Sequence, residues 1–240
     1  MNRIYNPEFV FHSTNPYHFR LQDDQELARY VLTDNDAEMN VGTWNSQIFQ
    51  NNHPIHLEIG CGYGEFMERF SQLHPNLNFI GMDFRFKRMF KLAKKFLHLG
   101  ENFRLIRGRG ERIQYIFAKQ EIERCYLFFP DPWPKERQHK NRLIQETFLN
   151  ALSNVLIPKG EFWFKTDHPG LFESSLEAIE KNPKFKIIFQ TKSLYEGNLD
   201  TNDPTNHPLS TPLFRTKFET IFLKQNLPIY ALVAINSEEK

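Results

Sequence analysis

The amino-acid sequence predicts a single-domain α/β fold, in which helices cover both sides of a doubly wound, mostly parallel sheet. Three observations support this fold class. The chain has 240 residues, of which 40% are hydrophobic, and this is enough for one sizeable core. Between residues 55 and 193, apolar runs of strand length alternate with amphipathic stretches, as in repeated βα units. A glycine-rich turn also follows the first apolar run, where doubly wound folds bind ligands.

The predicted elements follow one another in a regular order. Strands are predicted at residues 55–60, 78–83, 103–107, 124–129, 160–166 and 184–191, with a last strand at 229–235. Helices are predicted between them at residues 64–73, 86–99, 111–119, 139–156 and 169–181. The helix at 86–99 has the clearest pattern, because Phe86, Phe90 and Ala93 share one side while lysines surround the other.

The two ends of the chain have less regular patterns. Residues 1–50 show no reliable period, and we expect them to form an N-terminal arm or a cap over the sheet. Residues 51–240 are expected to form the main domain. Within it, residues 196–212 are polar and rich in proline, which predicts a long loop.

The charges are unevenly distributed, although the net charge is only +1. Residues 85–142 contain sixteen Lys or Arg and six Asp or Glu. Such segregation lets a near-neutral protein present one face to a polyanion, but solvated helix faces would give the same count.

Several classes of protein and site are disfavoured. No apolar run approaches the roughly 20 residues that a membrane helix needs, so we expect a cytoplasmic protein without membrane contact. Cys61 and Cys125 are too few for a disulfide framework and are expected to be buried, reduced thiols. His53 and His56 are the only close histidine pair, so no metal site is predicted.

The first candidate motif is E-I-G-C-G-Y-G-E-F at residues 58–66, a glycine-rich turn between a strand and a helix. Gly60, Gly62 and Gly64 let the backbone turn tightly and approach a nucleotide-like ligand closely. The third glycine of a dinucleotide fingerprint is missing, as is the P-loop lysine. Glu58 would repel a pyrophosphate but suits an ammonium group, such as that of S-adenosylmethionine.

The second predicted strand ends at Asp83, nineteen residues after Gly64. One carboxylate at this place can accept hydrogen bonds from both hydroxyls of a ribose. Together with the glycine-rich turn and Glu58, it predicts S-adenosylmethionine as the cofactor.

The second motif is F-F-P-D-P-W-P-K at residues 128–135, at the end of a strand expected beside the first. It places Asp131 in a rigid turn at the carboxyl end of a strand, where doubly wound folds have their active sites. A purely structural proline turn around a buried Trp133 is the alternative. The basic residues from Lys135 to Arg142 can pair with phosphates.

Two shorter motifs have a structural and a functional interpretation of equal weight. In F-K-T-D, at residues 164–167, Asp167 either caps the next helix or belongs to a site. The motif T-K-F-E, at residues 216–219, fits a capping box ahead of an apolar run.

Taken together, these four motifs resemble the tRNA (guanine-N7-)-methyltransferase family. The resemblance covers roughly residues 43–235, and P-D-P-W-P-K with its basic run is the most specific part. It implies the S-adenosylmethionine-dependent methyltransferase fold and methyl transfer to N7 of a guanosine in the variable loop of tRNA. The partner would be tRNA, and both a monomer and a homodimer remain open.

The resemblance also implies residue roles, with Asp131 as the catalytic residue. The residues expected to bind the cofactor are Glu58, Gly60, Gly62, Gly64, Asp83, Gly110, Glu111 and Asp131. The residues expected to bind the substrate are Lys135, Asp167, Thr216, Lys217, Phe218 and Glu219. The family usually has an aspartate near the adenine where this chain has Arg109, so Glu111 or a backbone amide is expected to replace that contact.

The residue types agree with this chemistry independently of the resemblance. Guanine N7 has an in-plane lone pair and no proton, so methyl transfer needs positioning and electrostatics rather than a strong base. Asp131 would stabilise the cationic purine, and Glu219 or Asp167 would hold its N1 and N2 donors. Three alternatives stay open: an adenine N6 (exocyclic-amine) methyltransferase, a catalytically silent tRNA-binding module and, least favoured, a small-molecule methyltransferase.

Overall fold

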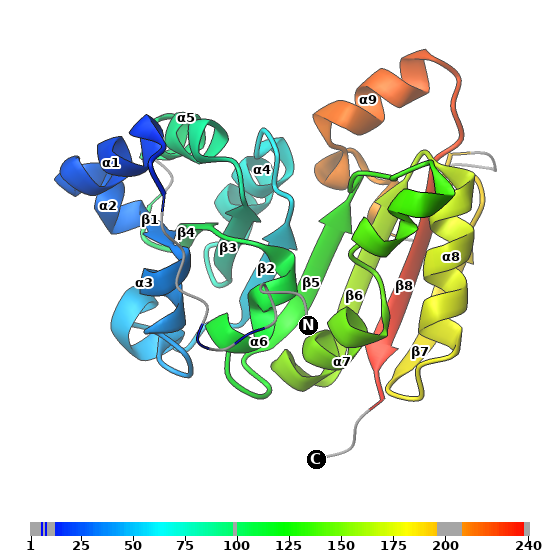
Figure 1. Cartoon of the computed structure of the whole chain (residues 1–240), viewed down its shortest axis with the longest axis horizontal. Helices are drawn as coiled ribbons and strands as arrows, with labels where there is room; N and C mark the ends of the chain where they lie inside the picture. The colour runs from blue at the N-terminus through cyan, green and yellow to red at the C-terminus, as the bar shows by residue number, and fades with distance from the viewer. Residues whose placement is uncertain (1–5, 7, 9–12, 98–99, 196–207, 238–240) are drawn as a thin grey trace.

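One eight-stranded sheet forms the centre of the fold (Figure 1). It is seen in a computed structural model that describes residues 6, 8, 13–97, 100–195 and 208–237. The strands are β1 (Val31–Thr33), β2 (Ile55–Ile59), β3 (Asn78–Asp83), β4 (Phe103–Arg107), β5 (Ile122–Phe128), β6 (Leu156–Thr166), β7 (Phe185–Thr191) and β8 (Tyr230–Asn236). Their order in the sheet is β1-β4-β3-β2-β5-β6-β8-β7, and β8 pairs antiparallel with β6 and β7 while all other pairs are parallel. The predicted doubly wound, mostly parallel sheet is confirmed.

The direction of strand addition reverses at β2, which pairs with β3 on one side and β5 on the other. Ligands of doubly wound folds bind beyond the carboxyl ends of the strands at such a switch point. Glu58, Asp83 and Asp131 lie near the ends of these three strands. The topology therefore brings the three predicted acids to one edge of the sheet.

Helices cover both faces of the sheet (Figure 1). One buried cluster joins the sheet to α1 (Pro16–Asp23), α2 (Gln25–Tyr30), α4 (Glu65–Leu73) and α5 (Phe86–Phe96). A second cluster joins it to α3 (Asp34–Glu38), the π-helix η2 (Trp44–Phe49), α6 (Ile113–Ile116), α7 (Glu146–Val155) and α8 (Pro169–Glu180). Successive β5 residues alternate between the clusters, because Tyr126 and Phe128 belong to the first and Cys125 and Leu127 to the second.

Most predicted elements are confirmed, with boundaries that differ by a few residues. The predicted helix at 139–156 is divided, because Arg142 has an extended backbone between the 3-10 helix η4 (Glu136–Asn141) and α7. The predicted helix at 111–119 ends at α6, because Phe117 is extended; it begins with the 3-10 helix η3 (Gly110–Arg112). Residues 196–207 of the predicted loop lie outside the described residues, and two short 3-10 helices, η5 (Pro208–Ser210) and η6 (Pro212–Phe214), follow them.

The segment before β2 adds an edge strand to the sheet, since Val31 in β1 pairs in parallel with Leu105 in β4. Arg107, at the end of β4, forms a buried ion pair with Asp34, the first residue of α3. The helices of this segment have five to eight residues and β1 has three. Elements this short give no periodic signal in a sequence window.

Two simpler expectations can be compared with the structure. Cys61 and Cys125 are both buried and form no disulfide. Among the described residues, no helix has the length and apolar character needed to span a bilayer.

Candidate active site

The glycine-rich turn joins β2 to α4 and has an unusual backbone. Gly60, Gly62 and Gly64 have φ values of 75°, 57° and 71°, a left-handed conformation that costs other residues roughly 1–2 kcal/mol. A Cβ atom on Gly64 would lie 2.4 Å from Cε2 of Phe96 in α5, whereas one on Gly60 would meet no atom within 4 Å. The turn therefore packs tightly against α5 at one end and leaves open space at the other.

Glu58 lies on β2 just before this turn and is 3% exposed. Its Oε2 atom is buried and has no hydrogen-bond partner among the described residues. Burial raises the pKa of Glu58 well above its usual range, and the positive charge of Lys165 opposes that shift. A buried carboxylate oxygen without a donor suits a cationic ligand. The site therefore fits the ammonium end of S-adenosylmethionine.

Asp83 ends β3 and is also buried. Its Oδ1 accepts a hydrogen bond of 2.8 Å from the backbone N–H of Arg85, and its Oδ2 accepts one of 3.0 Å from Nη1 of Arg88. Each carboxylate oxygen keeps a second lone pair. The two arginines thus fix Asp83 and still leave it able to accept hydrogen bonds from a ribose.

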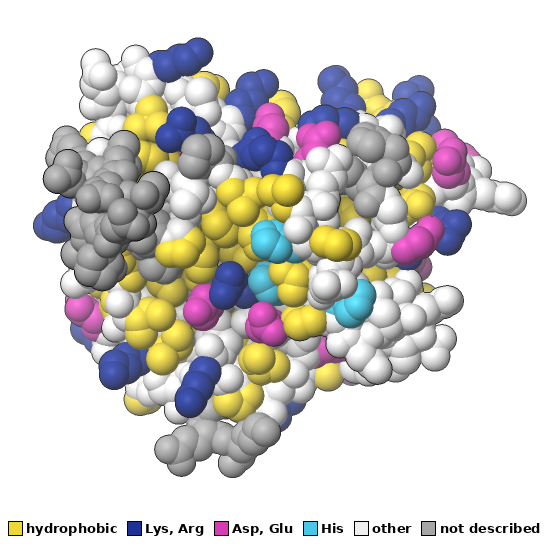
Figure 2. Space-filling view, turned by 180° about the vertical axis from the view of Figure 1, so that it is seen from behind, with side chains coloured by type: hydrophobic (Ala, Val, Ile, Leu, Met, Phe, Trp, Pro, Cys, Tyr) yellow, Lys and Arg dark blue, Asp and Glu magenta, His cyan; other side chains and the backbone are white. Residues whose placement is uncertain are grey.

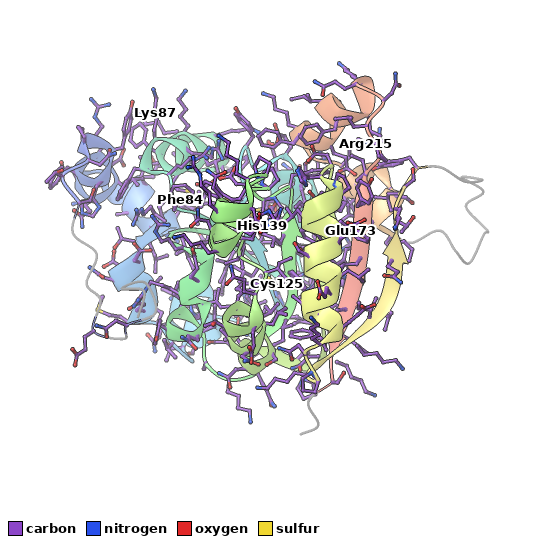
Figure 3. The ribbon with its side chains drawn as sticks, turned by 45° about the vertical axis from the view of Figure 1, so that its right-hand side comes forward. Phe84, Lys87, Cys125, His139, Glu173 and Arg215 are labelled. Carbon is purple, nitrogen blue, oxygen red and sulfur yellow. The ribbon has the colours of Figure 1, made fainter. Side chains whose placement is uncertain are left out.

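The loop after β4 contains the other residues expected near the cofactor. Gly110 is buried, and a Cβ atom there would lie 2.8 Å from Ile59 and 2.9 Å from Leu143, so this glycine allows close packing. Glu111 is half-buried. The guanidinium of Arg109 lies 5.1 Å from the ring centre of Phe84, which Figure 3 labels. The structure therefore places Arg109 over the residue that follows Asp83.

The P-D-P-W turn after β5 is strained. Phe129 and Trp133 have φ values of 54° and 46°, which cost a non-glycine residue roughly 1–3 kcal/mol each. Such strain is concentrated at functional sites. Asp131 lies between them with its side chain 61% exposed, and its Oδ2 atom is 3.8 Å from Nη2 of Arg85. The turn thus presents an accessible carboxylate beside Arg85, which lies in the loop between β3 and α5.

Arg142 holds this turn in place. Its Nε donates to the backbone oxygen of Pro132 at 3.0 Å, and its Nη1 donates to Gly170 O at 3.0 Å and Ser174 Oγ at 2.8 Å. The sequence prediction that Arg142 pairs with phosphates is wrong, because its side chain is buried against α8. Lys135 is exposed at the start of η4.

The T-K-F-E motif begins α9 (Lys217–Lys224), and its predicted capping box forms. Glu219 accepts a hydrogen bond of 3.1 Å from Thr216 N, and Thr216 Oγ1 accepts one of 3.2 Å from Glu219 N. Glu219 is fully buried, and it also accepts hydrogen bonds from Lys165 Nζ at 2.6 Å and Tyr195 OH at 2.7 Å. Its carboxylate is therefore occupied by donors of the protein itself.

The start of α9 lies against the glycine-rich turn. Lys217 Nζ is 4.2 Å from the ring centre of Tyr63. The ring centres of Tyr63 and Phe218 are 5.9 Å apart. Asp167, by contrast, lies after the end of β6 and is half-buried. Burial raises the pKa of Asp167 above its usual value.

One narrow cleft joins the glycine-rich turn to the start of α9. Its lining includes Glu58, Gly60, Gly62, Tyr63, Thr216, Lys217 and Phe218. The structure thus brings predicted cofactor-binding and substrate-binding residues together. Eight other predicted residues do not line this cleft, namely Gly64, Asp83, Gly110, Glu111, Asp131, Lys135, Asp167 and Glu219.

Three residues of the site were not singled out in the sequence: Tyr63, Arg85 and Lys165. Lys165 does have a sequence signal, because it interrupts an apolar strand and a charge in such a strand needs a buried partner. Tyr63 has a weaker signal, an aromatic residue placed between two glycines of a turn. Arg85 has none, because only the folding of the chain brings it near Asp131.

Comparison with known proteins assigns the family. A family model described as “Putative methyltransferase” matches residues 52–232. The tRNA (guanine-N(7)-)-methyltransferase of Clostridium tetani is 36% identical over 202 residues, which cover 84% of this chain and 90% of that protein. The enzyme of the same name from Enterococcus faecalis is 39% identical over 167 residues, covering 67% of this chain and 76% of that protein. The chain belongs to the tRNA (guanine-N7-)-methyltransferase family.

This methyltransferase-family chain also matches part of a longer protein and two solved structures. A bifunctional glycosyltransferase/methyltransferase of Fusobacterium nucleatum is 33% identical over 90% of this chain, which spans 32% of that protein. The crystal structure of the 16S rRNA methyltransferase KamB has a TM-score of 0.58 at 14% identity, covering 82% of this chain and 94% of that one. A 16S rRNA (adenine(1408)-N(1))-methyltransferase from Catenulisporales acidiphilia, solved with its cosubstrate SAM, has a TM-score of 0.54 at 12% identity, covering 81% and 90%. The predicted methyltransferase fold is confirmed.

Proposed function

We propose that the chain transfers a methyl group from S-adenosylmethionine to N7 of a guanosine in the variable loop of tRNA. Family membership supports the reaction. The observation in the structure that carries the proposal is Glu58 Oε2, a buried carboxylate oxygen without a donor beside the glycine-rich turn. A tRNA substrate would place the protein in the cytoplasm.

The residues of the turn would hold the cofactor in two ways. Glu58 would accept a hydrogen bond from the ammonium group, and the open space at Gly60 would let the ligand approach the backbone. Asp83 would accept hydrogen bonds from the ribose while Arg85 and Arg88 keep its carboxylate oriented.

The reaction needs no base from the protein. S-adenosylmethionine, when bound, would supply a methyl group on a sulfonium sulfur. The lone pair of guanine N7 would form the bond to the methyl carbon as the carbon–sulfur bond breaks, and the sulfur would leave as a neutral thioether. The purine then carries the positive charge, and the accessible carboxylate of Asp131 would stabilise it. Arg85, 3.8 Å away, would orient that carboxylate.

The two acids considered for the N1 and N2 edge of guanine differ in availability. Glu219 is fully buried and occupied by Lys165, Tyr195 and the backbone of Thr216. Asp167 is half-buried, which leaves it able to accept hydrogen bonds from a base. We therefore assign the guanine edge to Asp167 and the phosphate contact to the exposed Lys135.

The test is to incubate the purified protein with unmodified tRNA and S-adenosylmethionine, digest the RNA and identify the methylated nucleoside by mass spectrometry. We expect N7-methylguanosine. N6-methyladenosine would instead support the exocyclic-amine alternative. No methylation despite tRNA binding would support the catalytically silent module, and methylation of small molecules alone would remove tRNA from the proposal.

A further inference from the structure

An exposed pair of aromatic rings separates the cleft at the glycine-rich turn from the surface of α5. Tyr63 is 45% exposed and Phe218 is 37% exposed, and their ring centres are 5.9 Å apart. The guanidinium of Arg88 lies 5.3 Å from the ring centre of Tyr63, and Lys217 Nζ lies 4.2 Å from it. Exposed aromatic rings beside cations are the usual platform on which proteins stack unpaired bases.

The ring contacts continue from this pair to the P-D-P-W turn. Phe218 stacks with Phe222 at a ring-centre distance of 6.4 Å, and Phe222 lies 5.5 Å from Phe129. Phe129 is two residues before Asp131. A base that stacks on Tyr63 or Phe218 would therefore lie at one end of a row of rings whose other end is next to the proposed catalytic carboxylate.

A basic groove begins on the other side of Tyr63. It is open to solvent and is lined by Gly62, Tyr63, Glu65, Arg85, Lys87, Arg88, Lys91, Leu92 and Lys95. Gly62, Tyr63 and Glu65 also line the cleft. The groove and the cleft therefore meet at the tyrosine. Figure 2 shows Lys and Arg side chains along the upper edge of the molecule, where Figure 1 places α5 and α9.

The cations of the groove are of two kinds. Arg85, Arg88 and Lys95 approach Asp131, Asp83 and Glu68, respectively. Lys87 and Lys91 are exposed and take part in no ion pair within the part of the chain that the structure describes. Figure 3 shows Lys87 at the top of the molecule, pointing away from the sheet. The two lysines are four residues apart on the helix, so their positions along its axis differ by about 6 Å.

We propose that this groove holds the phosphates of the RNA strand next to the methylated nucleotide, and that Tyr63 and Phe218 stack on a base where the strand enters the cleft. The inference rests on the proposed function for its partner, tRNA, and adds the path of the strand. Lys87 and Lys91 supply positive charge that no acidic residue of the described chain neutralises. Tyr63 marks the point at which the RNA strand leaves the groove and enters the cleft.

The first test measures the binding of unmodified tRNA to the double variant Lys87→Ala/Lys91→Ala by fluorescence anisotropy, between about 50 and 200 mM salt. The slope of log K against log salt should fall in magnitude by about 1.4 if the two lysines contact a single strand, or by about 1.8 if they contact a duplex. The matched control is Lys119→Ala/Lys186→Ala, which removes two exposed lysines at the opposite edge of the sheet and should leave the slope unchanged. Equal slopes for both double variants would overturn the proposed path.

The second test concerns the tyrosine. Tyr63→Ala should weaken tRNA binding by about 5- to 150-fold, the loss expected from one stacked base, whereas Tyr63→Phe should bind within about twofold of the wild type. The unfolding midpoint should match that of the wild type in both variants and shows that they are folded, because Tyr63 is 45% exposed. Equal tRNA affinity of Tyr63→Ala and the wild type would overturn the stacking role.

Failure of this inference and failure of the proposed function give different results. A wild-type protein that methylates tRNA while the lysine and tyrosine variants bind tRNA normally contradicts the inference alone. A wild-type protein that forms no N7-methylguanosine contradicts the proposed function, and the binding results with the variants would then describe a binding module.

Discussion

Two regions near the cleft contain lysines, namely the surface of α5 and the interior beneath α9. The lysines of α5 are exposed to solvent, whereas the lysine beneath α9 is buried. Lys87 and Lys91 of α5 are exposed and take part in no ion pair among the described residues. Lys165 of β6 is fully buried and donates hydrogen bonds to Glu219 at 2.6 Å and to the backbone oxygen of Phe214 at 2.7 Å. Burial lowers the pKa of Lys165, and the carboxylate of Glu219 opposes that shift.

The difference shows how one residue type serves two purposes. A hydrated lysine can exchange water for a phosphate with little loss, so α5 is suited to bind a polyanion. A buried lysine is retained only with partners that replace its water, so Lys165 holds the start of α9 in position over the glycine-rich turn. The P-D-P-W turn lies between the two regions, because Arg85 approaches Asp131 from one side and Phe222 contacts Phe129 from the other.

The buried pair should give the largest effect. Glu219→Ala leaves the charge of Lys165 buried without its partner and should lower the free energy of unfolding by about 3–5 kcal/mol, measured with urea. Removing both charges together, in Lys165→Met/Glu219→Leu, should restore the part of that loss that comes from the unpaired charge, but not the part that comes from the hydrogen bonds of Thr216 and Tyr195 to Glu219. As a control, Glu177→Ala breaks an exposed ion pair with Lys181 and should change stability by no measurable amount. A similar stability for Glu219→Ala and Glu177→Ala would remove the contrast between the buried and the exposed pairs.

The turn between the two regions should be needed for chemistry rather than for stability. Asp131→Ala should lower kcat by roughly 10²- to 10³-fold, the usual loss when one electrostatic stabiliser of a transition state is removed. Its unfolding midpoint should match that of the wild type, because the carboxylate is exposed and its nearest cation is 3.8 Å away. Single-turnover methylation and thermal unfolding measure the two quantities. Near-normal kcat would exclude Asp131 as the stabilising carboxylate.

The packing of α5 against the glycine-rich turn should have a smaller effect. Gly64→Ala combines a positive φ with a contact of 2.4 Å to Phe96 and should lower the free energy of unfolding by about 2–4 kcal/mol. Gly60→Ala has the same kind of φ but open space around its Cβ, and should lose only about 1–2 kcal/mol. Urea unfolding of the two variants isolates the contact with α5, and equal losses would show that this contact does not fix the position of the helix.

Glu58 should give the mildest effect, a pH dependence of cofactor binding. Burial raises its pKa, so below that pKa the carboxyl group of the free protein is neutral and cannot attract an ammonium group. Affinity for S-adenosylmethionine should therefore increase as the pH rises, by up to about tenfold per pH unit, and then level off. Calorimetry across pH on the wild type and on Glu58→Gln tests this, since the variant should bind weakly at every pH. A wild-type affinity that does not change with pH would contradict it.

Much of the site was predictable because its signals are local. The three left-handed glycines, the capping box at Thr216 and the strands of the central sheet each depend on residues only a few positions apart. The roles of Arg142 and Glu219 were not predictable in this way. Arg142 lies in a basic run yet is buried, and Glu219 fits a capping box but is also paired with a lysine on a distant strand.

By itself, the sequence determined the α/β class, the glycine-rich turn and the position of three acids near the strand ends, because hydrophobic period and turn residues act over a single element. Only the tertiary structure decided which charges are buried and which are free. Sheet register brings Lys165 under α9, and helix packing sets α5 beside Tyr63. Burial depends on what packs against a residue from elsewhere in the chain, so lysines are buried and paired in one region and exposed to solvent in the other.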